Sequence, residues 1–145
     1  MRATVDSDVL IYAELEPESE KGSHAQAAIN LAAPRGILAI QALLEFLAVV
    51  RRRKPERIES AYAKVFAWSE VFVTAPTTDS VVSLSASLVR RHRFQIWDAV
   101  IWAAARAAGA EVILSEDLQH GLSLEGMRAI NPFRLENEEL ADLLA

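Results

Sequence analysis

The chain of 145 residues contains no cysteine. Disulfides, thiolate metal sites and thiol catalysis are therefore excluded. Long apolar runs are also missing, because no stretch approaches the about 20 apolar residues needed to cross a bilayer. Arg2 and Asp6 interrupt any apolar run at the N-terminus, so no signal peptide is expected. These absences predict a soluble, cytoplasmic protein with no membrane association.

The composition that is present fits one globular domain. Apolar residues make up 52% of the chain and charged residues 24%, which are ordinary values. A chain of this length suits a single domain with a substantial core. Because there is no internal repeat, linker or low-complexity segment, we predict one domain over residues 1–134 and a C-terminal helix or tail over 135–145.

The net charge of −5 argues, taken alone, against a nucleic-acid ligand, because phosphate affinity comes from lysine and arginine. The basic side chains are nevertheless concentrated in two clusters near the ends of expected helices. Either cluster could contact RNA phosphates, or could be a solvated helix end where positive charge stabilises the helix dipole. The candidate phosphate contacts are Arg51, Arg52, Arg53, Arg90, Arg91 and Arg93.

Strand-like and helix-like segments alternate along the chain, which predicts an α/β fold with a parallel sheet. A short strand ends at Val5, and a helix starts near Val9 with Ser7 or Asp8 as its expected N-cap. Further strands are expected at 37–40, 71–74, 111–114 and, more weakly, 128–130. Further helices are expected at 23–33, 41–53, 55–69, 79–91 and 97–108. The tryptophans Trp68, Trp97 and Trp102 are expected in the core rather than as stacking platforms for bases.

Acidic side chains occur where the expected strands give way to helices. The carboxyl ends of parallel strands share one edge of the sheet, so carboxylates far apart in sequence can meet there. Such a cluster repels itself unless a cation neutralises it, which points to Mg²⁺ or Mn²⁺. Each acid alone has an ordinary structural explanation, such as a helix cap or a solvated turn. The carboxylates concerned are Asp6, Asp8, Glu45, Asp98, Glu116 and Asp117.

The order and spacing of these motifs resemble the PIN domain, and most of all the VapC ribonuclease toxins of bacterial VapBC toxin–antitoxin modules. The resemblance rests on four acidic motifs in order and covers residues 1 to about 134. The motifs are Val5–Tyr12, Glu45, Trp97–Ala99 and Leu114–Gln119, followed by Asn131–Phe133.

This resemblance implies a three-layer α/β/α sandwich with a short parallel sheet. It implies an endoribonuclease that hydrolyses RNA phosphodiester bonds through a metal-activated water, with Mg²⁺ or Mn²⁺ as cofactor. It also implies an RNA substrate, a cognate antitoxin protein as partner, and a homodimer. The implied catalytic and metal-binding residues are Asp6, Glu45, Asp98 and Asp117, with Asp8, Ser115 and Glu116 as supporting residues.

The chain departs from the family pattern at Asp8, where the family usually has asparagine. An amide can donate a hydrogen bond to a neighbouring carboxylate, whereas an ionised carboxylate cannot. Asp8 would therefore add a ligand, raise the pKa of a neighbour by repulsion, or turn outward.

Two alternative functions remain open from the sequence. A catalytically weak PIN-like binding module would keep the fold without a working metal site. A haloacid-dehalogenase-type phosphatase also begins with Asp-x-Asp after a strand, but it needs a lysine after a later strand. The last lysine of the chain, Lys64, lies within an expected helix, which disfavours the phosphatase.

Overall fold

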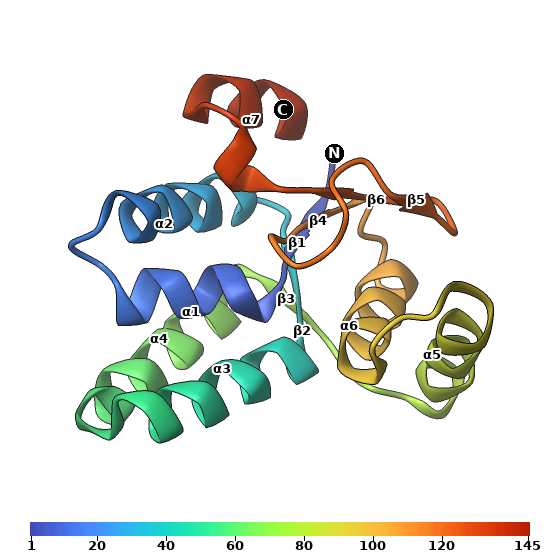
Figure 1. Cartoon of the computed structure of the whole chain (residues 1–145), viewed down its shortest axis with the longest axis horizontal. Coiled ribbons are helices and arrows are strands. Elements are labelled where there is room, and N and C mark those ends of the chain that lie inside the picture. The colour runs from blue at the N-terminus through green and yellow to red at the C-terminus, as the bar shows by residue number, and fades with distance from the viewer.

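The computed structural model describes all residues from 1 to 145 and has a twisted central sheet (Figure 1). The strand order is β3-β2-β1-β4-β6-β5, and only β5 and β6 pair antiparallel. The parallel α/β sheet predicted from the sequence is confirmed, whereas the antiparallel edge strand β5 was not anticipated. The strands are β1 (Ala3–Val5), β2 (Ile37–Ala39), β3 (Val73–Ala75), β4 (Val112–Leu114), β5 (Ser123–Leu124) and β6 (Met127–Ile130).

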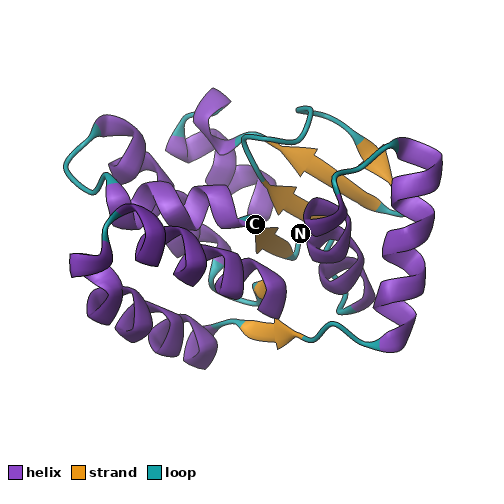
Figure 2. Cartoon of the chain, turned by 60° about the horizontal axis from the view of Figure 1, so that its bottom comes forward, coloured by secondary structure: helices purple, strands orange, loops and turns teal.

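Helices cover both faces of the sheet and give the predicted three-layer sandwich (Figures 1 and 2). One face carries α1 (Ser7–Leu15), α2 (Glu20–Ala32), α3 (Ile40–Arg53), α4 (Ile58–Val71) and α7 (Asn137–Leu144). The other face carries α5 (Asp79–His92) and α6 (Ile96–Ala107). Two short 3-10 turns, η1 (Pro55–Arg57) and η2 (Pro132–Arg134), precede α4 and α7.

The core is divided by the sheet into two apolar clusters, because successive side chains of a strand point to opposite faces. In β4, Val112 and Leu114 pack with the α1–α4 layer, while Ile113 packs with α5 and α6. This two-sided burial explains why the strands read as short, continuous apolar runs. Because β1, β2, β3, β4 and β6 run parallel, their carboxyl ends lie at one edge of the sheet, where α1 and α3 begin.

Several local details differ from the sequence-based predictions. The N-cap of α1 is Asp6, whose side chain accepts a hydrogen bond from the Ser7 amide at 2.8 Å, and not Ser7 or Asp8. The core assignment holds for two tryptophans, since Trp68 is 7% exposed and Trp102 is 0% exposed. It is wrong for Trp97, which is 48% exposed at the start of α6. Trp97 lies in the first turn of α6, where Ile96 is exposed too, whereas the buried residues of this helix begin at Ala99.

The C-terminal residues form the helix α7, which packs on α2 (Figure 1). Leu140 of α7 is fully buried in the same cluster as the first strand. The amino group of Met1 donates to the Leu144 carbonyl at 3.2 Å, so the two ends of the chain lie together. None of the helices is long and apolar enough to span a bilayer.

Candidate carboxylate site

The fold brings acidic side chains from four parts of the chain to one edge of the sheet. Strands β1 and β4 pair in parallel with Val5 opposite Leu114, so the residues that follow them are neighbours. Asp6 and Asp8 follow β1, and Asp117 follows β4. Glu45 lies on α3 and Asp98 in the first turn of α6. Burial, and after it the negative charges of Asp98, Asp8 and Asp117, raises the pKa of Glu45, and burial followed by the charge of Asp117 raises the pKa of Asp98. The predicted convergence of carboxylates on one edge is therefore what the backbone produces.

Asp6 is the most enclosed acid of this group, with 2% of its surface exposed. One carboxylate oxygen caps α1 through the Ser7 amide, and the other accepts a hydrogen bond from the Ser115 hydroxyl at 2.7 Å. The Ser115 hydroxyl in turn accepts from the Leu118 amide at 3.3 Å. The hydrogen bond between Asp6 and Ser115 thus joins the end of β1 to the turn after β4, and it places the Ser115 side chain in direct contact with an acid of the site.

Asp8 faces into the site rather than outward. Its Oδ2 accepts hydrogen bonds from the Glu116 amide at 2.9 Å and the Asp117 amide at 3.0 Å. Its Oδ1 is buried and has no hydrogen-bond partner. Of the three roles considered for Asp8, an outward orientation is excluded. The other two are compatible with this geometry, because the free oxygen is available as a ligand and the charge lies close to Asp6.

Burial and mutual repulsion raise the pKa values of four carboxyl groups of the site. Burial, and next the charge of Asp8, raises the pKa of Asp6 well above its usual value. Burial, followed by the charge of Asp117, raises the pKa of Asp8 to about 6. Burial also raises the pKa of Glu45 and of Asp98, with repulsion between the two adding to the shift of Glu45 and the charge of Asp117 adding to that of Asp98. A bound cation would reverse these shifts, because it favours the ionised forms.

The donor set fits a divalent cation in its chemistry. The ion pairs of the structure involve only Glu14 and Glu116, so no lysine or arginine neutralises the other acids of the site. Besides Asp8 Oδ1, the buried Glu45 Oε2 has no hydrogen-bond partner. Hard oxygen ligands of this kind suit Mg²⁺ and Mn²⁺. No group of three or more histidine, aspartate or glutamate side chains is placed to share one ion directly.

The two basic clusters differ in their position relative to the acidic side chains. Arg52 and Arg53, at the end of α3, line a surface hollow of about 370 Å³ together with Asp8 and Asp117. Arg51 is exposed but does not line this hollow. The second cluster, at the end of α5, is also exposed, and no hydrogen bond or ion pair joins it to the acids of the site. Its members are Arg90, Arg91 and Arg93.

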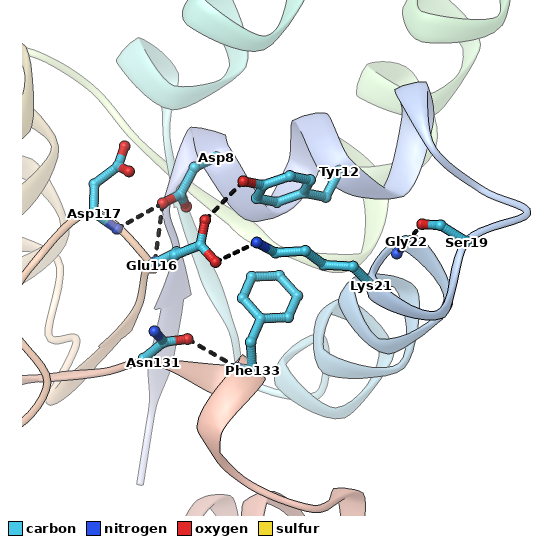
Figure 3. Close-up of polar contacts among 9 residues, drawn as sticks. All are labelled: Asp8, Tyr12, Ser19, Lys21, Gly22, Glu116, Asp117, Asn131 and Phe133. Atoms are coloured by element: carbon cyan, nitrogen blue, oxygen red, sulfur yellow. Dashed lines mark hydrogen bonds and ion pairs between the residues drawn. The ribbon is translucent and has the colours of Figure 1, made fainter.

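Sequence reasoning missed two residues that contact the site through Glu116. Tyr12 Oη donates to Glu116 Oε1 at 2.7 Å, and Lys21 Nζ forms an ion pair with Glu116 Oε2 (Figure 3). Burial alone would raise the pKa of Glu116, but the hydrogen bonds from Lys21 and Tyr12 outweigh it and lower that pKa. Tyr12 lies four residues after Asp8 on α1, so helical spacing could have indicated it. Nothing in the sequence around Lys21 points to this contact.

A second charged group, unrelated to the candidate site, is buried farther along α1. Glu14 is 0% exposed and accepts a hydrogen bond from Lys64 Nζ at 2.7 Å. Arg57 Nε lies 3.6 Å from the other carboxylate oxygen. This cluster connects α1 to α4, and the burial of Glu14 gives no reason to place it in the site.

The fold is an α/β/α sandwich, and acidic side chains follow β1 and β4 at the carboxyl edge of its sheet. The family model of the PIN domain matches residues 3–121, and the chain therefore belongs to the PIN domain family. This membership gives no support to the phosphatase alternative. No curated protein sequence matches the chain.

Solved structures with the same fold include VapC toxins and their complexes. VapC20 of Mycobacterium tuberculosis, described as a sarcin–ricin loop cleaving toxin, is 19% identical with a TM-score of 0.66, covering 79% of this chain and 89% of its own. A toxin–antitoxin complex from Klebsiella pneumoniae is 17% identical with a TM-score of 0.67, covering 90% of this chain and 97% of its own. DNA-bound VapBC from Salmonella typhimurium is 17% identical with a TM-score of 0.64, covering 89% and 96%. The chain thus has a VapC-like PIN fold.

Proposed function

We propose that the protein is a metal-dependent endoribonuclease that acts as the toxin of a VapBC-type toxin–antitoxin module. The observation that carries the proposal is the group of five mutually repelling carboxylates at the carboxyl edge of the sheet, without a basic partner. Such a group is costly for a protein to maintain unless a cation uses it. Its members are Asp6, Asp8, Glu45, Asp98 and Asp117.

The hydrogen bonds of the acidic side chains indicate how each could contribute to binding a cation. Asp8 and Glu45 each offer a buried oxygen without a partner, and Asp98 and Asp117 reach the surface. Asp6 holds Ser115 and caps α1 with the same two oxygens, each of which keeps a second lone pair for a ligand. A divalent cation at this edge would supply an activated water and offset charge on the leaving oxygen of the phosphodiester.

RNA would approach across the hollow between α1 and the end of α3. Arg52 and Arg53 line this hollow beside Asp8 and Asp117, so a phosphate bound by the arginines would lie next to the carboxylates. We therefore prefer Arg52 and Arg53 as the residues that bind RNA phosphates. Arg90 and Arg91 do not line this hollow. Net charge of −5 does not oppose this, since the positive charge is local.

We also propose an antitoxin protein as partner, and a homodimer as the assembly. The antitoxin proposal is supported by two structural relatives, a toxin–antitoxin complex from Klebsiella pneumoniae and DNA-bound VapBC from Salmonella typhimurium. Coexpression with the neighbouring reading frames, followed by copurification and light scattering, would test both proposals.

The decisive experiment replaces Asp98 with asparagine, which removes one charge with little change of shape. Asp98→Asn should abolish Mg²⁺-dependent cleavage of RNA while leaving thermal stability within a few degrees. Asp79→Asn is the matched control, because Asp79 lies in the first turn of the neighbouring helix α5 and is exposed. Unchanged cleavage by purified Asp98→Asn would contradict the proposal. Calorimetric titration with Mn²⁺ would separate an enzyme from a binding module, which should give no metal-dependent heat.

A further inference from the structure

Glu116 is the centre of a contact network on the side of the site that faces α2. Its two carboxylate oxygens are used separately, one by the Tyr12 hydroxyl at 2.7 Å and the other by the Lys21 ammonium group (Figure 3). These partners come from α1 and α2, which lie 104 and 95 residues before Glu116 in the chain. The side chain of Glu116 is therefore tied to two helices while its backbone belongs to the turn after β4.

Lys21 is itself held in place by two aromatic rings. Its Nζ lies 4.2 Å from the centroid of the Tyr12 ring and 4.9 Å from that of Phe133. The two rings meet edge to face, with centroids 5.4 Å apart. A cation over ring faces is attracted by their electrons, so the rings fix the position of an otherwise flexible lysine.

The backbone of the same turn holds Asp8. The amides of Glu116 and Asp117 both donate to Asp8 Oδ2, at 2.9 and 3.0 Å, which leaves Oδ1 free and buried. A displacement of the turn would therefore move the Asp8 carboxylate and the Asp117 side chain together. Two side chains of the turn itself also hold it in place, Glu116 through Tyr12 and Lys21, and Ser115 through its hydrogen bond to Asp6.

We propose that Lys21 and Tyr12 are positioning residues for the carboxylate site: they anchor Glu116, and through it the two backbone amides that orient Asp8 and place Asp117 for binding a divalent cation. The inference rests on the proposed metal-dependent function and assigns Glu116 to support rather than to ligation. Residues that orient ligands in this way typically change metal affinity 10- to 100-fold when they are lost.

The sign of the effect distinguishes positioning from simple electrostatics. Lys21→Met removes a positive charge near an anionic site and leaves Glu116 without its ion-pair partner, so Coulomb attraction alone would tighten the binding of a cation. Positioning predicts the opposite, a weaker affinity for Mn²⁺ by about 10-fold. Lys21→Arg keeps the charge and the hydrogen bond, and should restore affinity to within about threefold of the wild type. Gln26→Met is the control, because Gln26 is on the same helix and its side chain donates a hydrogen bond to Asn30, away from Glu116.

Two measurements on the full chain test the proposal. Hydrogen exchange of the Glu116 and Asp117 amides, followed by NMR in metal-free protein, should accelerate in Lys21→Met and Tyr12→Phe but not in Gln26→Met. Calorimetric titration with Mn²⁺, without RNA, should show the weaker binding and its rescue by Lys21→Arg.

The outcomes separate this inference from the function on which it rests. Mn²⁺ affinity in Lys21→Met that equals or exceeds that of the wild type, or exchange that accelerates uniformly over all amides, overturns the positioning role. A wild-type protein that binds Mn²⁺ but does not cleave RNA contradicts the proposed function while the positioning role stands or falls on the two measurements. A wild-type protein that binds no Mn²⁺ contradicts both.

Discussion

The carboxylate of Asp8 accepts a hydrogen bond from the backbone amide of Asp117 at 3.0 Å, across 109 residues of sequence. The contact joins the first turn of α1 to the turn after β4, and the Glu116 amide reinforces it at 2.9 Å. An asparagine oxygen could accept the same two hydrogen bonds. The negative charge of Asp8 is therefore not required for this structural contact.

Replacing Asp8 with asparagine should stabilise the metal-free protein at pH 7. The variant keeps an acceptor for both amides and removes a charge whose pKa is raised to about 6 in the folded state. A shift of about two pKa units corresponds to at most about 3 kcal/mol, so an increase of a few degrees in Tm is expected. Thermal unfolding in the presence of a chelator measures it. A lower Tm would mean that the charge contributes favourably to the fold.

Metal-free stability should decrease as the pH rises from about 4 to about 7. The folded-state pKa values of Asp6, Asp8, Glu45 and Asp98 all lie above their usual values, so the folded state binds more protons than the unfolded state in this window. Stability then falls with pH, and the loss is complete only above the raised pKa values. Urea unfolding at pH 5 and pH 7 provides the comparison, and saturating Mn²⁺ should flatten the difference. Stability that rises over this range in metal-free protein would contradict the charge arrangement.

The two basic clusters should differ in their contribution to RNA binding. In the inactive Asp98→Asn background, Arg52→Gln with Arg53→Gln should reduce the slope of log affinity against log salt by about 0.7 per lost phosphate contact. Arg90→Gln with Arg91→Gln should leave the slope nearly unchanged, because those residues do not line the hollow beside the acids. Filter binding of a short single-stranded RNA over a series of salt concentrations gives both slopes. Equal slopes for the two double variants would remove the basis for choosing the first cluster.

The exposed and the buried tryptophan of α6 should respond differently to truncation. Trp102 is 0% exposed and packs edge to face on Phe94 at 5.5 Å, so Trp102→Ala should cost about 3–5 kcal/mol. Trp97 is 48% exposed, and Trp97→Ala should cost about 1 kcal/mol or less. Urea unfolding followed by circular dichroism measures both values. A cost for Trp97→Ala close to that of Trp102→Ala would show that Trp97 is buried in solution.

Much of the fold could be predicted because its elements depend on neighbouring residues. Short apolar runs predicted all five of the parallel strands, the last of them more weakly, and helical spacing predicted the helices. The prediction failed where a partner strand decides the structure. Strand β5 is two residues long and exists only through its pairing with β6. The predicted burial of Trp97 was also wrong, because exposure depends on how the elements pack together and not on residue type alone.

The candidate site was predictable to a similar degree. The motifs of Asp6, Glu45, Asp98 and Asp117 pointed to one edge of a parallel sheet, and that edge is where the structure has them. Their individual roles remain proposals. The contacts of Lys21 and Tyr12 with Glu116 could not be predicted, because they join three elements whose packing the sequence does not specify.

The sequence by itself determined the alternation of strands and helices, and with it the edge at which the carboxylates gather, because both follow from residue order and local periodicity. The tertiary structure alone decided which oxygen atoms are satisfied and which stay free, as in Asp8, where Oδ2 is held by two amides and Oδ1 has no partner. The physical reason is that hydrogen bonding and desolvation change when the distance between two segments changes by a few tenths of an ångström, and these segments are far apart in the chain.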